Sequence, residues 1–162
     1  MTNQIDPKQL RNVAGAFATG VTIVTALRND GSVHGMTANS FVSLSLDPPL
    51  VAFSVREQGR ILQYLEFGKA VGISILSDQQ EAISNQFAGY GDDELVIEME
   101  SHANGAQTIK HALAWYATSI EDIIPVGDHS MIICRVQDLD RSEHGSPLLY
   151  FSGYKTIASA KV

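Results

Sequence analysis

The stretch "GMTANSFVSLSLDPPL", residues 35–50, alternates like a β-strand but is rich in small and polar residues. Thr37, Asn39 and Ser40 carry hydroxyl or amide groups, and the stretch ends in two prolines. Small side chains leave backbone N–H and C=O groups accessible, and short polar side chains add hydrogen-bond donors and acceptors. The stretch is therefore either a polar edge strand that ends in a proline turn, or an edge that binds a flat, polar, aromatic ligand.

Strand-type patterns continue on both sides of this stretch. "VTIVTAL" (21–27) is β-branched and apolar on both faces, which is typical of a strand inside a fold. "RNDGS" (28–32) predicts a turn, because Asn, Asp and Gly tolerate positive φ. Besides the strand in the opening stretch, strands are predicted at residues 50–55, 70–76, 112–120, 130–139 and 147–156.

Three short helices are predicted around these strands. Asp6-Pro7 has the pattern of an N-cap followed by proline, and the helix that it begins is expected to end near Gly20. A second helix is expected at residues 60–67. Ser77 and Gln80 form a capping-box pattern for a third helix, which is expected to run to Phe87. In the first helix, the apolar residues Leu10, Val13, Ala14 and Phe17 fall on one face. In the third helix, Ile83 and Phe87 lie on the expected inner face.

Six or seven strands with short helices between them predict a mainly β fold, with peripheral α-helices around a closed or nearly closed antiparallel barrel. A Rossmann sheet is excluded, because it needs a long helix after nearly every strand and the chain has no GxGxxG motif. The length predicts one domain over residues 1–162. The acidic segment 89–105 is either a solvated loop or a mobile cover over a site.

The composition narrows the classes of function. A net charge of −7 argues against non-specific nucleic-acid binding and against adhesion to an anionic membrane. Cys134 is the one cysteine, so no internal disulfide forms, and the five scattered histidines predict no metal site. The polar N-terminus has no signal-peptide core and no apolar run approaches a membrane span. We therefore expect a soluble, cytoplasmic protein.

The opening stretch belongs to a longer pattern in four segments: "GVTIVTALRNDGSVHGMTANSFVSLSLDPPLVAFSV" (20–55), "ISILSDQQEAISNQFAG" (73–89), "GDHSMIICRV" (127–136) and "PLLYFSGYKT" (147–156). In this order and spacing, they resemble the short-chain flavin reductase family over nearly the whole chain. The resemblance implies an FMN-binding split barrel that transfers hydride from NADH to FMN or FAD. It also implies a homodimer, and release of reduced flavin to a partner flavin-dependent monooxygenase.

The resemblance also implies site residues. They are Met36, Thr37, Ala38, Asn39, Ser40, Ser54, Val55, Arg56, Arg60, Phe87, Ala88, His129, Tyr150 and Phe151. The first five match the edge that binds the flavin ring, and residues 54–60 match the part near the ribityl chain and phosphate. His129 is the implied catalytic residue, because an imidazole near the nicotinamide can orient it or assist protonation of reduced flavin.

Each of these assignments has a structural alternative. Arg56 and Arg60 are otherwise solvated arginines, Phe87 and Tyr150 otherwise fill the core or the barrel end, and His129 is otherwise a turn residue. "REQGR" (56–60) lacks the hydroxyls common in the family, although arginines bind phosphate well. Residues 105–114 also depart from the family pattern, so no substrate contacts are assigned in residues 90–114.

Two rival functions follow from the same barrel. One is a flavoprotein electron carrier or sensor that keeps FMN and does not use NADH. The other is a binding module for haem or another cofactor, against which His129 and the polar stretch argue. The family resemblance implies NADH as the donor, with NADPH as the alternative; no basic cluster dedicated to a ribose 2′-phosphate is evident. Cys134 lies on an apparent strand face with Ile132 and Val136, which favours a buried structural cysteine.

Overall fold

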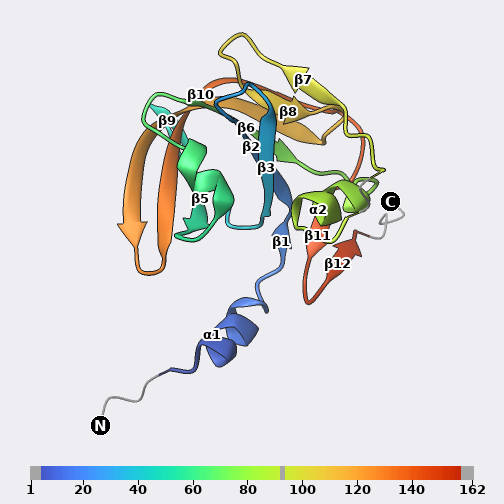
Figure 1. Cartoon of the computed structure of the whole chain (residues 1–162). Coiled ribbons are helices and arrows are strands. Elements are labelled where there is room, and N and C mark those ends of the chain that lie inside the picture. The colour runs from blue at the N-terminus through green and yellow to red at the C-terminus, as the bar shows by residue number, and fades with distance from the viewer. Residues whose placement is uncertain (1–4, 92–93, 158–162) are drawn as a thin grey trace.

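The computed structural model describes residues 5–91 and 94–157 (Figure 1). Its helices are α1 (Pro7–Ala14), the 3₁₀ helix η1 (Arg60–Tyr64) and α2 (Glu81–Phe87). Its strands are β1 (Thr19–Gly20), β2 (Thr22–Leu27), β3 (Val33–Ala38), β4 (Val42–Leu46), β5 (Pro49–Arg56), β6 (Ala70–Ile75), β7 (Met99–Ser101), β8 (Gln107–Ile109), β9 (Ala114–Val126), β10 (His129–Arg141), β11 (Leu148–Tyr150) and β12 (Tyr154–Thr156). The predicted mainly β class with short helices is confirmed.

A seven-stranded antiparallel sheet forms the body, in the order β3-β2-β6-β9-β10-β5-β4. Its two edge strands, β3 and β4, follow each other in the chain but do not pair, so the curled sheet is a barrel split between them. The helix η1 packs against β2, β3 and β5 and places Ile61 in the core with 1% exposure. The predicted antiparallel split barrel is confirmed.

The opening stretch forms two strands instead of the single strand predicted. Strand β3 ends at Ala38 and β4 begins at Val42, so Asn39–Phe41 cross from one edge of the sheet to the other. The Ser40 hydroxyl accepts a hydrogen bond from the Ser54 N–H at 3.0 Å and donates to the Ser54 carbonyl at 3.3 Å. This bridge to β5 holds the crossing segment, and the polar residues lie where strand pairing stops.

Two apolar clusters lie on opposite faces of the central strands. The cluster inside the barrel includes Phe53 and Ile132, and the outer cluster includes Ile23, Ile109 and Leu148. Strand β2 contributes to both clusters, and its first five residues are buried. This confirms the prediction of an inner strand with two apolar faces.

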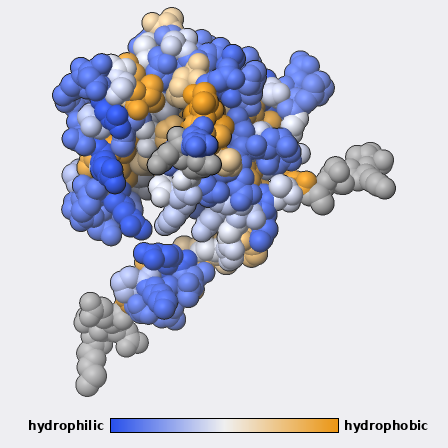
Figure 2. All heavy atoms as spheres, turned by 45° about the vertical axis from the view of Figure 1, so that its right-hand side comes forward, coloured by the Kyte–Doolittle hydropathy of each residue, from blue (hydrophilic) through white to orange (hydrophobic). Residues whose placement is uncertain are grey.

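The first helix is shorter than predicted. It begins as expected, with Asp6 accepting a hydrogen bond from the Lys8 N–H and proline at the first helical position, but it ends at Ala14. The Gly15 N–H bonds back to the Arg11 carbonyl, and the chain then extends into β1. The apolar face of the helix is exposed, because none of the helical residues is buried. Figure 1 shows α1 below the barrel, and in Figure 2 it stands off from the body.

Four other boundaries differ from prediction. The helix η1 stops at Tyr64, and α2 begins at Glu81 instead of following Ser77, whose backbone forms a β-bridge with Pro147. The capping box is half present, since the Gln80 side chain accepts from the Ser77 N–H at 3.0 Å. Strands β9 and β10 extend beyond their predicted ends into one long hairpin. The predicted last strand is the hairpin β11–β12, because Ser152 and Gly153 have φ of 51° and 113° and turn the chain.

Segment 89–105 is partly structured. Strand β7 pairs with β8 in a short antiparallel hairpin over the barrel. Asp92 and Asp93, two of the acidic residues of this segment, lie outside the described residues. None of the helices in the described ranges is long and apolar enough to cross a membrane.

Candidate active site

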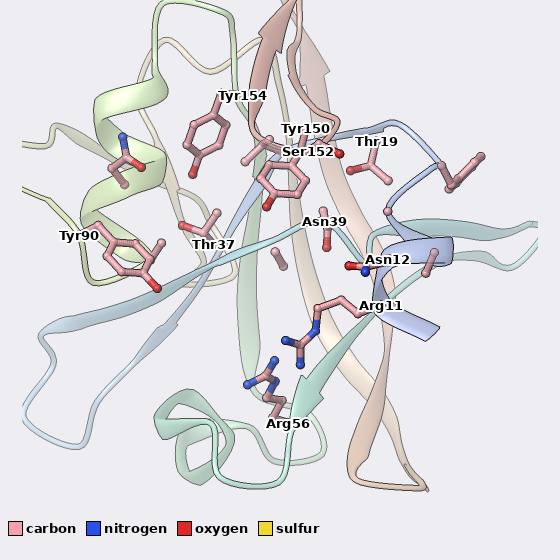
Figure 3. Close-up of a pocket in the computed structure, with 17 residues that line it drawn as sticks. Arg11, Asn12, Thr19, Thr37, Asn39, Arg56, Tyr90, Tyr150, Ser152 and Tyr154 are labelled. Atoms are coloured by element: carbon pink, nitrogen blue, oxygen red, sulfur yellow. The ribbon is translucent and has the colours of Figure 1, made fainter. Parts of the chain in front are cut away.

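A groove of about 940 Å³ lies between α1 and the barrel, beside the end of β3. The ends of β3, β5 and α2, the α2–β7 loop, the hairpin β11–β12 and α1 all contribute to its walls (Figure 3). Its volume is in the range of small-molecule sites. The groove therefore joins segments that are distant in the sequence.

The end of β3 forms a polar shelf of Thr37, Ala38 and Asn39 in this groove. The Thr37 hydroxyl donates to the Ser84 carbonyl of α2 at 2.6 Å, so its oxygen remains available as an acceptor. Asn39 is exposed at the point where the chain leaves the sheet, and its amide can both donate and accept. The shelf can thus bind the mixed donor and acceptor edge of a heterocycle.

Tyrosines from the hairpin β11–β12 form the opposite wall. The rings of Tyr150 and Tyr154 lie 5.7 Å apart at 76°, an edge-to-face arrangement. The Tyr154 hydroxyl is 2.7 Å from the Ser84 hydroxyl, which joins this hairpin to α2 and, through the Ser84 carbonyl, to Thr37. Tyr90 lines the groove from the loop after α2. These side chains combine apolar ring surface with polar tips.

The lower end of the groove in Figure 3 is cationic. Arg56 lies at the end of β5, and Arg11 of α1 lines the same region. Among the described residues that line the groove, these two arginines are the charged ones. The chain as a whole is acidic, so this end of the groove is a local region of positive charge that favours an anion.

His129 lies directly across the β5–β10 ladder from Arg56 but does not line the groove. Its Nδ1 is 2.7 Å from the Asp128 carboxylate. The hydrogen bond and charge of His129 hold the pKa of Asp128 below its usual value, and the Arg56 charge adds to this in the same direction. The structure thus places the implied catalytic histidine beside the cationic end of the groove.

This geometry can be compared with known proteins. A family model for the flavin reductase like domain matches residues 14–158. The chain belongs to the flavin reductase family. The reductase component of 4-hydroxyphenylacetate 3-monooxygenase from Thermus thermophilus is 39% identical over 142 residues, which cover 87% of this chain and 90% of the relative. The chain spans 46% of the length of another curated relative, a probable flavin reductase from Rhizobium meliloti (strain 1021).

Solved structures of flavin reductases have the same fold. The flavin reductase PheA2 in its native state is 38% identical with a TM-score of 0.86, covering 96% of this chain and 100% of its own. The NADH:FAD oxidoreductase SgcE6 of Streptomyces globisporus C-1027, in complex with NAD and FAD fragments, is 32% identical with a TM-score of 0.87. That match covers 99% of this chain and 100% of SgcE6.

The residues that the flavin reductase resemblance implied fall into two groups. Those that line the groove are Thr37, Ala38, Asn39, Arg56, Ala88 and Tyr150. The remaining residues pack behind the groove or lie away from it. Met36 packs on the core inside the barrel, and Val55 is buried there with 2% exposure. Ser40 and Ser54 bond to each other behind the shelf.

Three further implied residues lie away from the groove lining. Phe87 packs against Gly35 and the outer apolar cluster, in agreement with the core-packing alternative. Phe151 is in the turn between β11 and β12, where its N–H bonds to the Gly153 carbonyl at 2.9 Å. Arg60 begins η1 near His34, whose pKa is lowered first by burial and then by the charges of Arg28 and Arg60. Arg60 therefore belongs to a different cluster from Arg56.

Several groove residues were missed by sequence reasoning. They are Arg11, Asn12, Thr19, Asn85 and Tyr90. Arg11 and Asn12 were missed because no local pattern shows that the first helix reaches over the site. Thr19 could be found only from the structure. Its buried hydroxyl oxygen has no hydrogen-bond partner among the described residues.

Cys134 takes no part in the groove. It is fully buried in the barrel core, and burial raises the pKa of its thiol to about 12. A thiol with such a pKa is almost entirely protonated near neutral pH and is a poor nucleophile. Within the described ranges, no three His, Cys, Asp or Glu side chains form a group that could hold a metal ion.

Proposed function

We propose that this chain is an NAD(P)H:flavin oxidoreductase of the EC 1.5.1 type, which reduces FMN or FAD with NADH. The observation that carries the proposal is the groove, in which the polar shelf, the tyrosine wall and the arginine end meet. These three features suit the pyrimidine edge, the ring face and the phosphate of a flavin nucleotide. Family membership supports the same reaction.

The chain's own part in this reaction is binding and orientation. A bound flavin supplies the redox chemistry by accepting hydride from the nicotinamide. Thr37 and Asn39 bind the polar edge of the ring, and Arg56 binds the phosphate. The tyrosine wall excludes water from one side of the groove and limits the orientation of the rings.

Relatives support the donor and the recipient that we propose. The name of SgcE6 includes NADH and FAD, and the Thermus relative is the reductase component of a monooxygenase. We therefore infer that reduced flavin from this chain is used by a partner flavin-dependent monooxygenase. An open groove at the surface suits a flavin that is bound, reduced and released.

The assay that tests the function is NADH oxidation with riboflavin, FMN and FAD, run beside an absorption spectrum of the purified protein. We expect NADH to be oxidised only when flavin is added or retained, with NADPH as the comparison donor. Yellow protein that anaerobic NADH does not bleach would identify an electron carrier or sensor instead. Colourless protein that does not quench FMN fluorescence would contradict any flavin function.

His129→Ala is expected to slow NADH-dependent flavin reduction more than it weakens flavin binding. A positioned imidazole that assists proton transfer contributes about 100-fold or more to a rate. Stopped-flow reduction at saturating flavin and a flavin titration measure the two effects separately. His144→Ala, in an exposed loop, is the control. Unchanged reduction in His129→Ala would remove His129 from the mechanism.

We also propose a homodimer of this 162-residue reductase domain in the cytoplasm. The support is the exposed apolar face of α1, where Leu10 is 59% and Val13 is 68% exposed. An eight-residue helix is too short to be stable by itself, so a second copy is the surface that we expect to cover it. Light scattering of wild type and Val13→Asp measures the oligomeric state. We expect wild type to be a dimer and Val13→Asp to dissociate more readily. A monomeric wild type would contradict the homodimer.

A further inference from the structure

Two guanidinium groups from different elements point into the same end of the groove. Arg11 comes from α1 and Arg56 from the end of β5, and Figure 3 shows their side chains extending toward each other. The ion pairs within residues 5–91 and 94–157 are Lys69–Glu66, Lys110–Glu98, His129–Asp128 and Arg135–Glu121. Neither groove arginine takes part in one of these pairs. The Arg56 charge also acts on Asp128, but that carboxylate does not line the groove, and no acidic residue is among the described lining residues. Two like charges that converge repel each other, so this arrangement favours an anion between them.

Packing on the barrel does not hold α1 in place. None of its residues is buried, and the chain joins it to the body through a short segment before β1. Within α1, Arg11 and its neighbour Asn12 line the groove. An anion held by both arginines would therefore connect α1 to β5.

We propose that Arg11 and Arg56 together bind one phosphate group of a nucleotide, and that this contact holds α1 over the groove. The inference rests on the proposed function, because it places a nucleotide in this groove. Guanidinium groups bind phosphate oxygens through paired, charge-assisted hydrogen bonds, which makes two arginines a suitable phosphate clamp. No carboxylate among the described lining residues opposes the charge of this clamp.

Arg11 takes the place that the sequence suggested for Arg60. Arg60 does not line the groove, and its charge acts on His34 together with that of Arg28. The Arg28 guanidinium donates to His34 Nδ1 at 3.0 Å. The second cation of the phosphate site is thus on the first helix.

Binding measurements with a matched set of variants test the clamp. The variants are Arg11→Gln, Arg56→Gln and, as the control on the same helix, Lys8→Gln, which does not line the groove. Flavin fluorescence gives Kd for riboflavin, which has no phosphate, and for FMN. We expect each arginine variant to raise Kd for FMN about 10- to 100-fold, as for a lost charge-assisted hydrogen bond, and to leave riboflavin binding unchanged. Lys8→Gln is expected to bind both ligands like wild type.

The phosphate has two sources with the same chemistry, the flavin and the nicotinamide dinucleotide. If the clamp binds the dinucleotide, Arg11→Gln leaves both flavins unaffected and raises KM for NADH but not for reduced nicotinamide riboside, which has no phosphate. Either pattern supports the clamp and shows which of the two ligands supplies the phosphate. An Arg11→Gln variant that matches Lys8→Gln with every phosphorylated ligand would overturn it.

Hydrogen exchange tests the effect on α1. The phosphorylated ligand that the clamp binds is expected to slow exchange of the α1 amides in wild type, whereas its phosphate-free counterpart and the Arg11→Gln variant show no such protection. Equal exchange in all samples would overturn the role of α1. If wild type binds flavin, the reductase function is supported whatever the Arg11→Gln result, so the phosphate clamp can fail without the reductase function. If wild type has no affinity for flavin or NADH, both proposals are contradicted.

Discussion

Gly72→Ala is expected to lower the free energy of unfolding by about 3 kcal/mol, at the upper end of the usual range for an overpacked site. Gly72 is on β6, where the backbone of β8 crosses the outer face of the barrel. A Cβ at this position would lie 2.7 Å from both the Gln107 carbonyl carbon and the Thr25 hydroxyl, and closer still to the Gln107 oxygen. The Thr25 hydroxyl donates to that oxygen, so the added methyl group would also separate this hydrogen bond.

The crossing at Gly72 has little room to adjust. The Ile109 N–H bonds to the Ser74 hydroxyl at 2.8 Å, which holds β8 two residues further along β6. Ile109 itself is 1% exposed in the outer apolar cluster. Shifting β8 to admit a methyl group would therefore disturb buried contacts as well as the Thr25 hydrogen bond.

Thermal unfolding measures the Gly72 prediction. For a chain of this size the loss corresponds to a fall in Tm of about 6–12 °C. Gly20→Ala is the matched control, because a Cβ there has no neighbour within 4 Å and its φ is not positive. We expect that control to change stability by at most about 0.5 kcal/mol. Equal Tm values for the two variants would contradict the close crossing of β8 over β6.

Asn39→Ala is expected to raise Kd for flavin about 5- to 150-fold, which corresponds to about 1–3 kcal/mol. Asn39 lies in the crossing segment between the two sheet edges, and its exposed side chain lines the groove. In the complex its amide satisfies polar groups on the ring, and alanine leaves those groups buried without partners. Because the contact is with the ring, riboflavin and FMN should lose affinity equally.

An equal loss of affinity for riboflavin and FMN distinguishes Asn39→Ala from the arginine variants. Those variants are expected to weaken binding of a phosphorylated ligand and to leave riboflavin binding unchanged. Fluorescence titration with both ligands measures this, and Asn29→Ala in the β2–β3 turn is the control for an exposed asparagine. Thermal unfolding of Asn39→Ala should match wild type, since the side chain is exposed. Wild-type affinity in Asn39→Ala would contradict the assignment of the polar shelf to the flavin ring.

Much of the fold could be predicted because each strand carries its own pattern. The apolar residues on both faces of 21–27 correctly indicated a strand inside the fold, and the alternation at 50–55 indicated β5. The break inside residues 35–50 was missed, because a strand that ends and a strand that begins look alike when small residues join them. Only the sheet order shows that Asn39–Phe41 cross between two edges.

The residues of the candidate site that are consecutive in the sequence were predicted, and those that only the tertiary structure brings to the groove were missed. Thr37, Ala38 and Asn39 are consecutive in the opening stretch and do line the groove. Arg11 reaches the same groove only through the tertiary position of α1, and the sequence pattern of α1 is that of an ordinary amphipathic helix. The predicted end of that helix near Gly20 was wrong, since α1 ends at Ala14, and its apolar face is exposed in the described part of this chain.

The most direct test of the central claim is a crystal structure of the protein soaked with FMN. We expect the isoalloxazine ring to lie along Thr37–Asn39 and the phosphate to lie at Arg56, with Arg11 on its other side. Density for FMN at another place on the barrel, or a groove that stays without flavin at saturating FMN, would contradict the account.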